Sequence, residues 1–319
     1  MTPPKSAINA RRLAAFAALC VCLMQANGRA ASPPGARVRT AIDRAVAFLN
    51  GQIDRDGMVR GEYGTDAPRR LYGGRTALTA YALLTAGGDE TAEPLARSLR
   101  WLSAARLDGT YPVALRVCAL SQTKAARYRG MLSQDVRWLL KAAGPDAAYA
   151  YVPRLEDDAL YDNSCTQMAA LAMRRASERG VDVPASYWRA MEQHWLDEQQ
   201  TDGGWGYRVG PGAVRTRTYG SMTAAGLATL YACFDMLHAE RYVRCSGVQP
   251  YQPIARAHAW LGEHFAADEN PAKGVEWYYY WLFCVGQVGR ASGYRYFGEH
   301  DWYARGVSAL LARQHLDGS

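Results

Sequence analysis

The sequence predicts an all-α protein in which helix pairs repeat along the chain and close toward a ring. Three observations lead to this fold class. A bulky apolar residue followed by Leu recurs six times, each time with an Asp seven or eight positions later. A segment rich in Ala, Leu, Gly and Cys follows five of these copies. The alternation of Val, Ile or Thr with polar residues that is typical of strands recurs nowhere. A repeated unit of this kind must stack on its neighbours to bury its apolar face.

The first helix of each repeat ends at the bulky-Leu pair, as the helical spacing of Ile42, Val46 and Leu49 indicates. The six copies are Phe48-Leu49 with Asp56, Trp101-Leu102 with Asp108, Trp138-Leu139 with Asp146, Trp195-Leu196 with Asp202, Trp260-Leu261 with Asp268, and Leu310-Leu311 with Asp317. In four copies Gly follows the Asp, and Asp-Gly predicts a turn because Gly accepts positive φ. These helices carry charges such as Arg97 and Arg189, so we expect them on the outside.

The second helix of each repeat starts with polar and aromatic residues and then becomes almost entirely apolar, which places it inside. These starts are residues 74–80, 111–115, 163–167, 221–225 and 277–281. Charged outer helices therefore alternate with apolar inner helices, as in two concentric rings. The pattern gives six outer helices and five inner ones, so the sixth inner helix is missing. We expect either an open ring or a fragment of a longer chain. We favour the fragment, because a missing inner helix would expose the apolar faces of its neighbours to water, which costs free energy.

Residues 1–31 have the order of a secretory signal peptide. Basic residues at Lys5, Arg11 and Arg12 precede an apolar run over 13–24, and small residues follow. The run is short for a bilayer span, so we expect export to the periplasm or the extracellular space, with an N-terminal anchor as the alternative. Four basic and no acidic residues lie in this segment, so it carries much of the +7 net charge. No basic stripe indicates a nucleic-acid partner.

The segment 189–207 combines a basic residue, an aromatic-Leu pair, a glutamine and a Gly-x-Trp. Its parts are Arg189, Trp195-Leu196, Gln199 or Gln200, and Gly203-Gly204-Trp205. This order resembles the QW repeat of the terpene-cyclase and protein-prenyltransferase toroid family, which includes the squalene–hopene cyclases. The resemblance covers roughly residues 38–319. It implies an (α/α)6-type toroid with a cavity that opens at one end of the inner ring, and a glutamine that caps a neighbouring helix.

The resemblance does not extend to the catalytic acid of the family. Its class II cyclases protonate an alkene with the middle Asp of an Asp-x-Asp-Asp-Thr-Ala motif. The matching stretch is 162–167, in which Asp162 matches but Ser164 stands at the acid position. A serine hydroxyl is too weak an acid for this step, so we expect a degenerate cyclase motif. An active terpenoid cyclase that uses Asp157 or Asp158 is the alternative.

We expect no metal and no cofactor. The zinc prenyltransferases of the family need an Asp and a Cys after their Gly-Gly-aromatic segment, and residues 216–222 contain neither. We expect His258 and His264, on an outer helix, at the surface. A hydrolase is a further alternative, because carboxylates that could act as its catalytic groups precede the inner helices. These are Glu62, Glu156, Asp162 and Glu276.

Polar and aromatic residues at the inner-helix starts form the predicted ligand site, at one mouth of the cavity. They are Tyr72, Arg75, Tyr111, Asp162, Asn163, Gln167, Tyr219, Ser221 and Tyr278. Tyrosine offers apolar area and one hydroxyl, which suits a small apolar, peptide or carbohydrate ligand. The alternatives are that these tyrosines only pack neighbouring helices and that Asp162 is a simple N-cap. The sequence therefore favours an exported ligand-binding or scaffold module.

Overall fold

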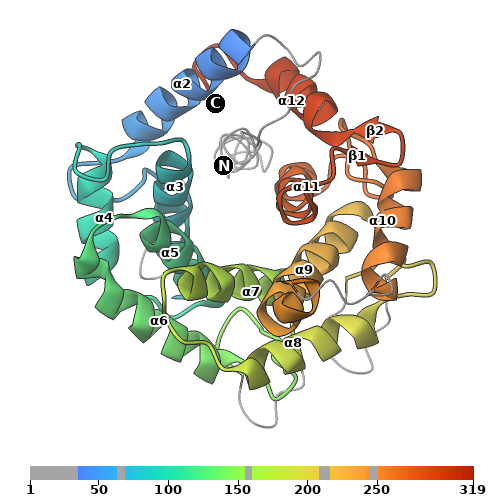
Figure 1. Cartoon of the computed structure of the whole chain (residues 1–319). Coiled ribbons are helices and arrows are strands. Elements are labelled where there is room, and N and C mark those ends of the chain that lie inside the picture. Colours follow the sequence, from blue (N-terminus) through green and yellow to red (C-terminus); the bar gives the residue numbers. More distant parts are fainter. Residues whose placement is uncertain (1–34, 63–68, 155–159, 208–215, 244–250) are drawn as a thin grey trace, which may run out of the picture.

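Outer and inner helices alternate along the chain in two concentric layers (Figure 1). The computed structural model describes residues 35–62, 69–154, 160–207, 216–243 and 251–319. The outer helices are α2 (Gly35–Gln52), α4 (Leu95–Ala104), α6 (Arg129–Ala142), α8 (Ala185–Glu198), α10 (Gln252–His264) and α12 (Trp302–Arg313). The inner helices are α3 (Gly74–Thr85), α5 (Thr110–Gln122), α7 (Asn163–Glu178), α9 (Gly220–Val243) and α11 (Tyr278–Ser292).

The remaining elements are short. Two 3-10 turns cover Arg69–Leu71 and Ala126–Tyr128, and strands β1 (Tyr296–Phe297) and β2 (His300–Asp301) pair antiparallel before α12. The all-α prediction is confirmed, and Trp101, Trp195 and Trp260 lie on outer helices as expected. Within the described residues, no helix is both long and apolar enough to cross a membrane.

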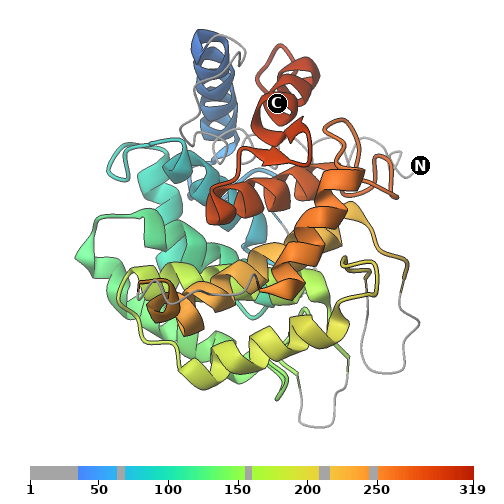
Figure 2. The same ribbon diagram turned by 45° about the vertical axis from the view of Figure 1, so that its right-hand side comes forward.

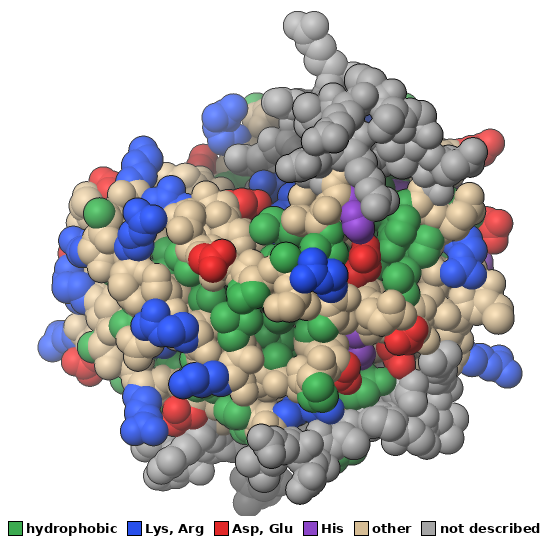
Figure 3. Space-filling model, turned by 60° about the horizontal axis from the view of Figure 1, so that its bottom comes forward, with side chains coloured by type: hydrophobic (Ala, Val, Ile, Leu, Met, Phe, Trp, Pro, Cys, Tyr) green, Lys and Arg blue, Asp and Glu red, His purple; other side chains and the backbone are tan. Residues whose placement is uncertain are grey.

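The outer helices form because their apolar residues fall on one side. In α4, Leu95, Leu99 and Leu102 are buried, while Arg97 and Arg100 bond to Glu93 at the surface. This is the amphipathic pattern of a helix that covers a core. On the face drawn in Figure 3, basic and acidic side chains are interspersed and form no single basic patch.

Two tryptophans of the best-matching repeat pack inside the wall of the toroid. The indole Nε1 of Trp205 donates to the backbone carbonyl of Trp195 at 2.9 Å, and both side chains are fully buried. The backbone N–H of Trp205 donates to Thr223 Oγ1 at 3.2 Å. Gly204 leaves the space for this contact, because a Cβ there would lie 2.7 Å from Thr223 Oγ1. The turn is thereby fixed to the start of α9.

A glutamine joins neighbouring outer helices at two places. Gln199 Nε2, after α8, donates to the backbone carbonyl of Pro253 in the first turn of α10 at 2.8 Å. Gln314 Nε2, after α12, donates to the carbonyl of Ala41 in α2 at the same distance. The second contact closes the outer layer, and α2 and α12 lie side by side in both views (Figures 1 and 2). No inner helix is described between α11 and α3.

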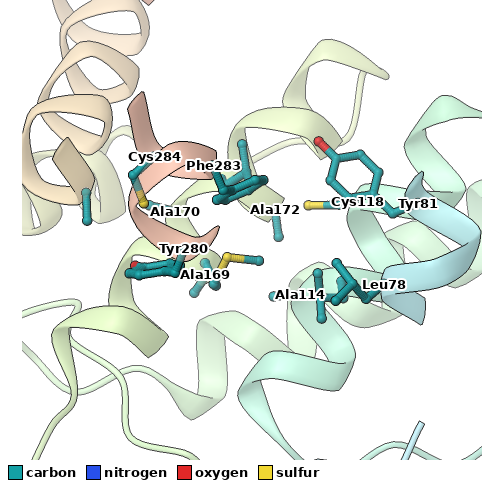
Figure 4. Close-up of a cluster of buried hydrophobic side chains, with 14 of the residues drawn as sticks. Leu78, Tyr81, Ala114, Cys118, Ala169, Ala170, Ala172, Tyr280, Phe283 and Cys284 are labelled. Carbon is teal, nitrogen blue, oxygen red and sulfur yellow. The ribbon is translucent and has the colours of Figure 1, made fainter. Parts of the chain in front are cut away.

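Apolar side chains of the inner helices form one buried cluster. Figure 4 shows Leu78 and Tyr81 of α3 on one side and Tyr280 and Phe283 of α11 on the other, with alanines of α7 between them. All four side chains are buried in one continuous apolar core.

Candidate functional site

Asp162 is the N-cap residue of α7 and is only 5% exposed. Its Oδ1 atom accepts hydrogen bonds from the backbone N–H groups of Ser164, at 2.8 Å, and Cys165, at 3.1 Å. The Ser164 hydroxyl donates to the same atom. The first N–H groups of a helix have no partner within the helix, and an Asp at the N-cap supplies one. The interpretation of Asp162 as an N-cap is therefore confirmed, and Oδ1 is the oxygen that caps the helix.

The second oxygen of Asp162 faces tyrosines. Its Oδ2 atom accepts a hydrogen bond from the hydroxyl of Tyr207. The pKa of Tyr207 is raised. Burial is the larger cause, and the negative charge of Asp162 is the next. The same two causes act on four other tyrosines, whose pKa values are also raised. They are Tyr111, Tyr151, Tyr219 and Tyr280. All five phenols are therefore protonated at neutral pH and can donate hydrogen bonds.

We call Asp162 and these five tyrosines the tyrosine cluster. Four of its members come from the starts of four successive inner helices: Tyr111, Asp162, Tyr219 and Tyr280. Tyr151 and Tyr207 come from the segments between an outer helix and the next inner helix. The rings of Tyr111 and Tyr151 stack at 5.7 Å between centroids. The toroid thus brings residues from repeats far apart in the sequence around one carboxylate.

The structure places Tyr111, Asp162 and Tyr219 of the predicted site in this cluster. Gln167 lies next to it, because the Tyr280 hydroxyl donates to Gln167 Oε1 at 3.1 Å. Four of the nine predicted residues therefore lie in or next to the tyrosine cluster.

Five predicted residues make contacts elsewhere. Tyr72 packs edge-on against Trp101, and Arg75 donates to the carbonyl of Gly61. The other three contacts are Asn163 Oδ1 with His194 Nε2 at 2.9 Å, Ser221 Oγ with Asn270 Nδ2 at 3.2 Å, and the Tyr278 hydroxyl with the carbonyl of Ala267 at 2.8 Å. These contacts join inner helices to loops and outer helices, so they hold the frame of the site.

Sequence reasoning missed Tyr151, Tyr207 and Tyr280. Two of them share a signal, because Tyr149-x-Tyr151 and Trp205-x-Tyr207 stand in the same place of two repeats. The first residue of each triplet donates its backbone N–H to a Thr of the following inner helix, at 3.0 and 3.2 Å. The second aromatic residue of each triplet then points to the cluster.

A second polar layer lies behind α7, toward the outer helix α8. His194 is 6% exposed, and burial lowers its pKa. Its ring contacts the rings of Tyr161 and Trp195 edge-on. The Tyr161 hydroxyl donates to Glu198 Oε1 at 3.1 Å. This layer is dominated by contacts between helices, and we assign it a structural role.

Two of the carboxylates proposed for other chemistry make contacts with residues close to them in the sequence. Glu62 Oε2 accepts from both the backbone N–H and the hydroxyl of Thr76, at 2.7 and 2.8 Å, and so caps α3. Glu276 lies 3.6 Å from Lys273 Nζ. Glu156, Asp157 and Asp158 lie outside the described residues. Among those described, no group of three His, Cys, Asp or Glu residues could hold a metal ion.

The structure is similar to that of ent-copalyl diphosphate synthase from Streptomyces platensis, with a TM-score of 0.53 over 90% of this chain. This chain has a terpene-cyclase-like fold. The two sequences are 17% identical, and the likeness covers 50% of the synthase, so it shows the fold alone. No family model and no curated protein match the sequence.

Proposed function

We propose that this terpene-cyclase-like toroid binds a small ligand and does not catalyse cyclisation. One observation carries the proposal: Ser164 stands at the acid position, and its hydroxyl donates to the capping carboxylate of Asp162. Asp162 accepts four hydrogen bonds in all, from two backbone N–H groups and two hydroxyls. The hydroxyl of Ser164 is too weak an acid to protonate an alkene.

The tyrosine cluster supports a binding role. It combines aromatic rings, protonated phenols and one buried carboxylate, which together suit a small ligand with an apolar body and a few polar groups. An apolar molecule, a short peptide or a carbohydrate has this character. A phenol is too weak an acid to protonate an alkene, so binding is the role that we assign to these tyrosines.

Ligand binding can be tested with squalene, a tripeptide and cellobiose as probes, by calorimetry and thermal unfolding. We expect one of them to bind saturably, and Tyr111→Leu to weaken that binding about tenfold, roughly the loss of one good hydrogen bond. Tyr72→Leu is the matched control, because Tyr72 lies outside the cluster against Trp101. Absence of saturable binding by all three probes would contradict the proposal.

The alternative is an active terpenoid cyclase, or another enzyme that uses mouth carboxylates. Incubation with squalene and geranylgeranyl diphosphate, followed by mass spectrometry of the products, separates the two. We expect no cyclised product from the wild type. A cyclised product that disappears in Asp158→Asn or Asp162→Asn would show that the chain is an enzyme.

We further propose that the protein is exported to the periplasm or the extracellular space. The order of charged, apolar and small residues in 1–31 supports this location. Mass spectrometry of the N-terminus in the native organism tests it. We expect a mature chain that starts near residue 32. Export is refuted if the protein is found only in the cytosolic fraction and still begins at residue 1.

A further inference from the structure

A cavity of about 140 Å³ lies among the inner helices α7, α9 and α11. It begins at Gln167, which also accepts a hydrogen bond from Tyr280 of the tyrosine cluster, and continues toward the C-terminal ends of α7 and α11. Its polar lining consists mainly of Gln167, Arg174, Arg175, Glu178, Gln287 and Arg290. On the α9 side the lining residues, such as Ala232, have small side chains. These small side chains leave room for the cavity.

Cations outnumber anions in this cavity. Three guanidinium groups line it, whereas Glu178 is its single lining carboxylate. Glu178 lies 2.9 Å from Arg175 and 3.3 Å from Arg174, and it is 43% exposed. Arg174 also pairs with Asp235 at 2.6 Å. Arg290 makes no ion pair within the described residues, although it faces the same space. Among the described residues that line the cavity, positive charge therefore exceeds negative charge.

Two donors are buried against the cavity without an acceptor. Gln287 is 9% exposed, and its Nε2 atom has no hydrogen-bond partner among the described residues. The Nε atom of Arg175 is also buried and unpaired there. A buried donor without a partner is energetically costly, so such groups are rare unless something else satisfies them. Burial lowers the pKa of Arg290, and the nearby charge of Arg175 lowers it further.

We propose that this cavity binds a small oxyanion, a phosphoryl or carboxylate group, between Arg175, Arg290 and Gln287. The planar guanidinium presents parallel N–H groups that match the oxygens of both groups, and charge-assisted bonds of this kind are strong. Arginines in the last turn of a helix are also attracted to its carbonyl end. That attraction does not explain an unpaired amide buried beside them. The three proposed ligands of the anion are not members of the tyrosine cluster, and the proposal does not depend on the function of that cluster.

Isothermal titration calorimetry with inorganic phosphate, pyrophosphate, acetate and citrate tests this site at constant ionic strength. We expect saturable binding of at least one anion to the wild type, with Arg290→Gln weakening it about tenfold or more. Tighter binding of phosphate and pyrophosphate identifies a phosphoryl ligand, and tighter binding of acetate and citrate identifies a carboxylate ligand. Arg290→Lys keeps the charge but loses the planar fork, and we expect an intermediate affinity.

Arg189→Gln is the matched control, because it removes one positive charge from the exposed face of α8. It should change affinity by no more than about twofold, since Arg189 does not line the cavity. Gln287→Leu provides a second test if Arg290→Gln fails to fold, and it should weaken binding without changing the net charge. The proposal is overturned if no anion binds saturably, or if the folded cavity variants bind as tightly as Arg189→Gln.

Discussion

The side-chain Nε2 atom of Gln314 donates a hydrogen bond to the backbone carbonyl of Ala41 over 2.8 Å. Its Oε1 atom accepts a bond from Arg44 at 2.9 Å. One amide therefore joins α12 to α2 with both of its polar atoms. Gly318 makes this approach possible, because its backbone lies against the carbonyl of Arg44 with φ of +91°. The outer layer closes here, at the place where no inner helix is described.

We expect Gln314→Ala to lower the free energy of unfolding by about 1–2 kcal/mol, because it removes two hydrogen bonds between helices. Urea denaturation measures this change. Gln193→Ala is the control, because Gln193 is exposed and bonds only within α8, to Asp197 at 2.8 Å. Equal losses in the two variants would show that the closure contact adds nothing to stability.

Gly203 should tolerate no side chain. Its φ is +91°, and a Cβ there would lie 2.7 Å from the backbone oxygen of Arg256 in α10. We expect Gly203→Ala to cost more than about 2 kcal/mol, from backbone strain and from displacement of the neighbouring helix. Gly51 lies in α2 with open space around it. Gly51→Ala should therefore leave stability unchanged or raise it by up to about 1 kcal/mol. Thermal unfolding that ranks the variants in the opposite order would contradict this packing.

The pair of Arg116 and Asp135 is the most buried ion pair of the described residues, with side chains 5% and 2% exposed. Arg116 Nε and Nη2 bond to the two carboxylate oxygens at 2.8 and 2.6 Å. We expect Asp135→Ala to cost about 3–5 kcal/mol, because it leaves a buried cation unpaired. The double variant Arg116→Met, Asp135→Leu should lose less than the single variant. Chemical denaturation checks both, and a larger loss in the double variant would contradict this reasoning.

His258 should make stability depend on pH. It accepts a hydrogen bond at Nε2 from the Tyr231 hydroxyl at 2.6 Å, and burial lowers its pKa to about 4. Because the unfolded chain takes up this proton near pH 6.5, stability is full above pH 6.5 and is lost as the pH falls toward 4. The loss is at most about 3 kcal/mol, at about 1.4 kcal/mol per pKa unit.

His258→Phe should flatten the fall in unfolding temperature between pH 6.5 and 4, because phenylalanine takes up no proton. The same fall in both proteins would mean that His258 does not cause it. The prediction that His258 lies at the surface was wrong, because its ring packs against Tyr294 and Phe297. His264, one turn and a half further along α10, is exposed as expected.

The sequence contained a signal for the glutamine contact that closes the outer layer. Gln199 and Gln314 each follow a bulky-Leu pair by three positions and precede a glycine by four. The structure gives both the same contacts to the next outer helix. The second copy has no tryptophan and therefore did not stand out.

The sequence by itself determined the all-α fold and the assignment of helices to the outer and inner layers. These features follow from where charged and apolar residues fall within each helix, which is local information. Only the tertiary structure decided that Tyr151 and Tyr207 join Asp162, and that Arg175 and Arg290 face one cavity. Each of these groups joins residues from helices or connecting segments separated along the chain. Their distances depend on how successive repeats rotate around the ring, and helical periodicity carries no information about that rotation.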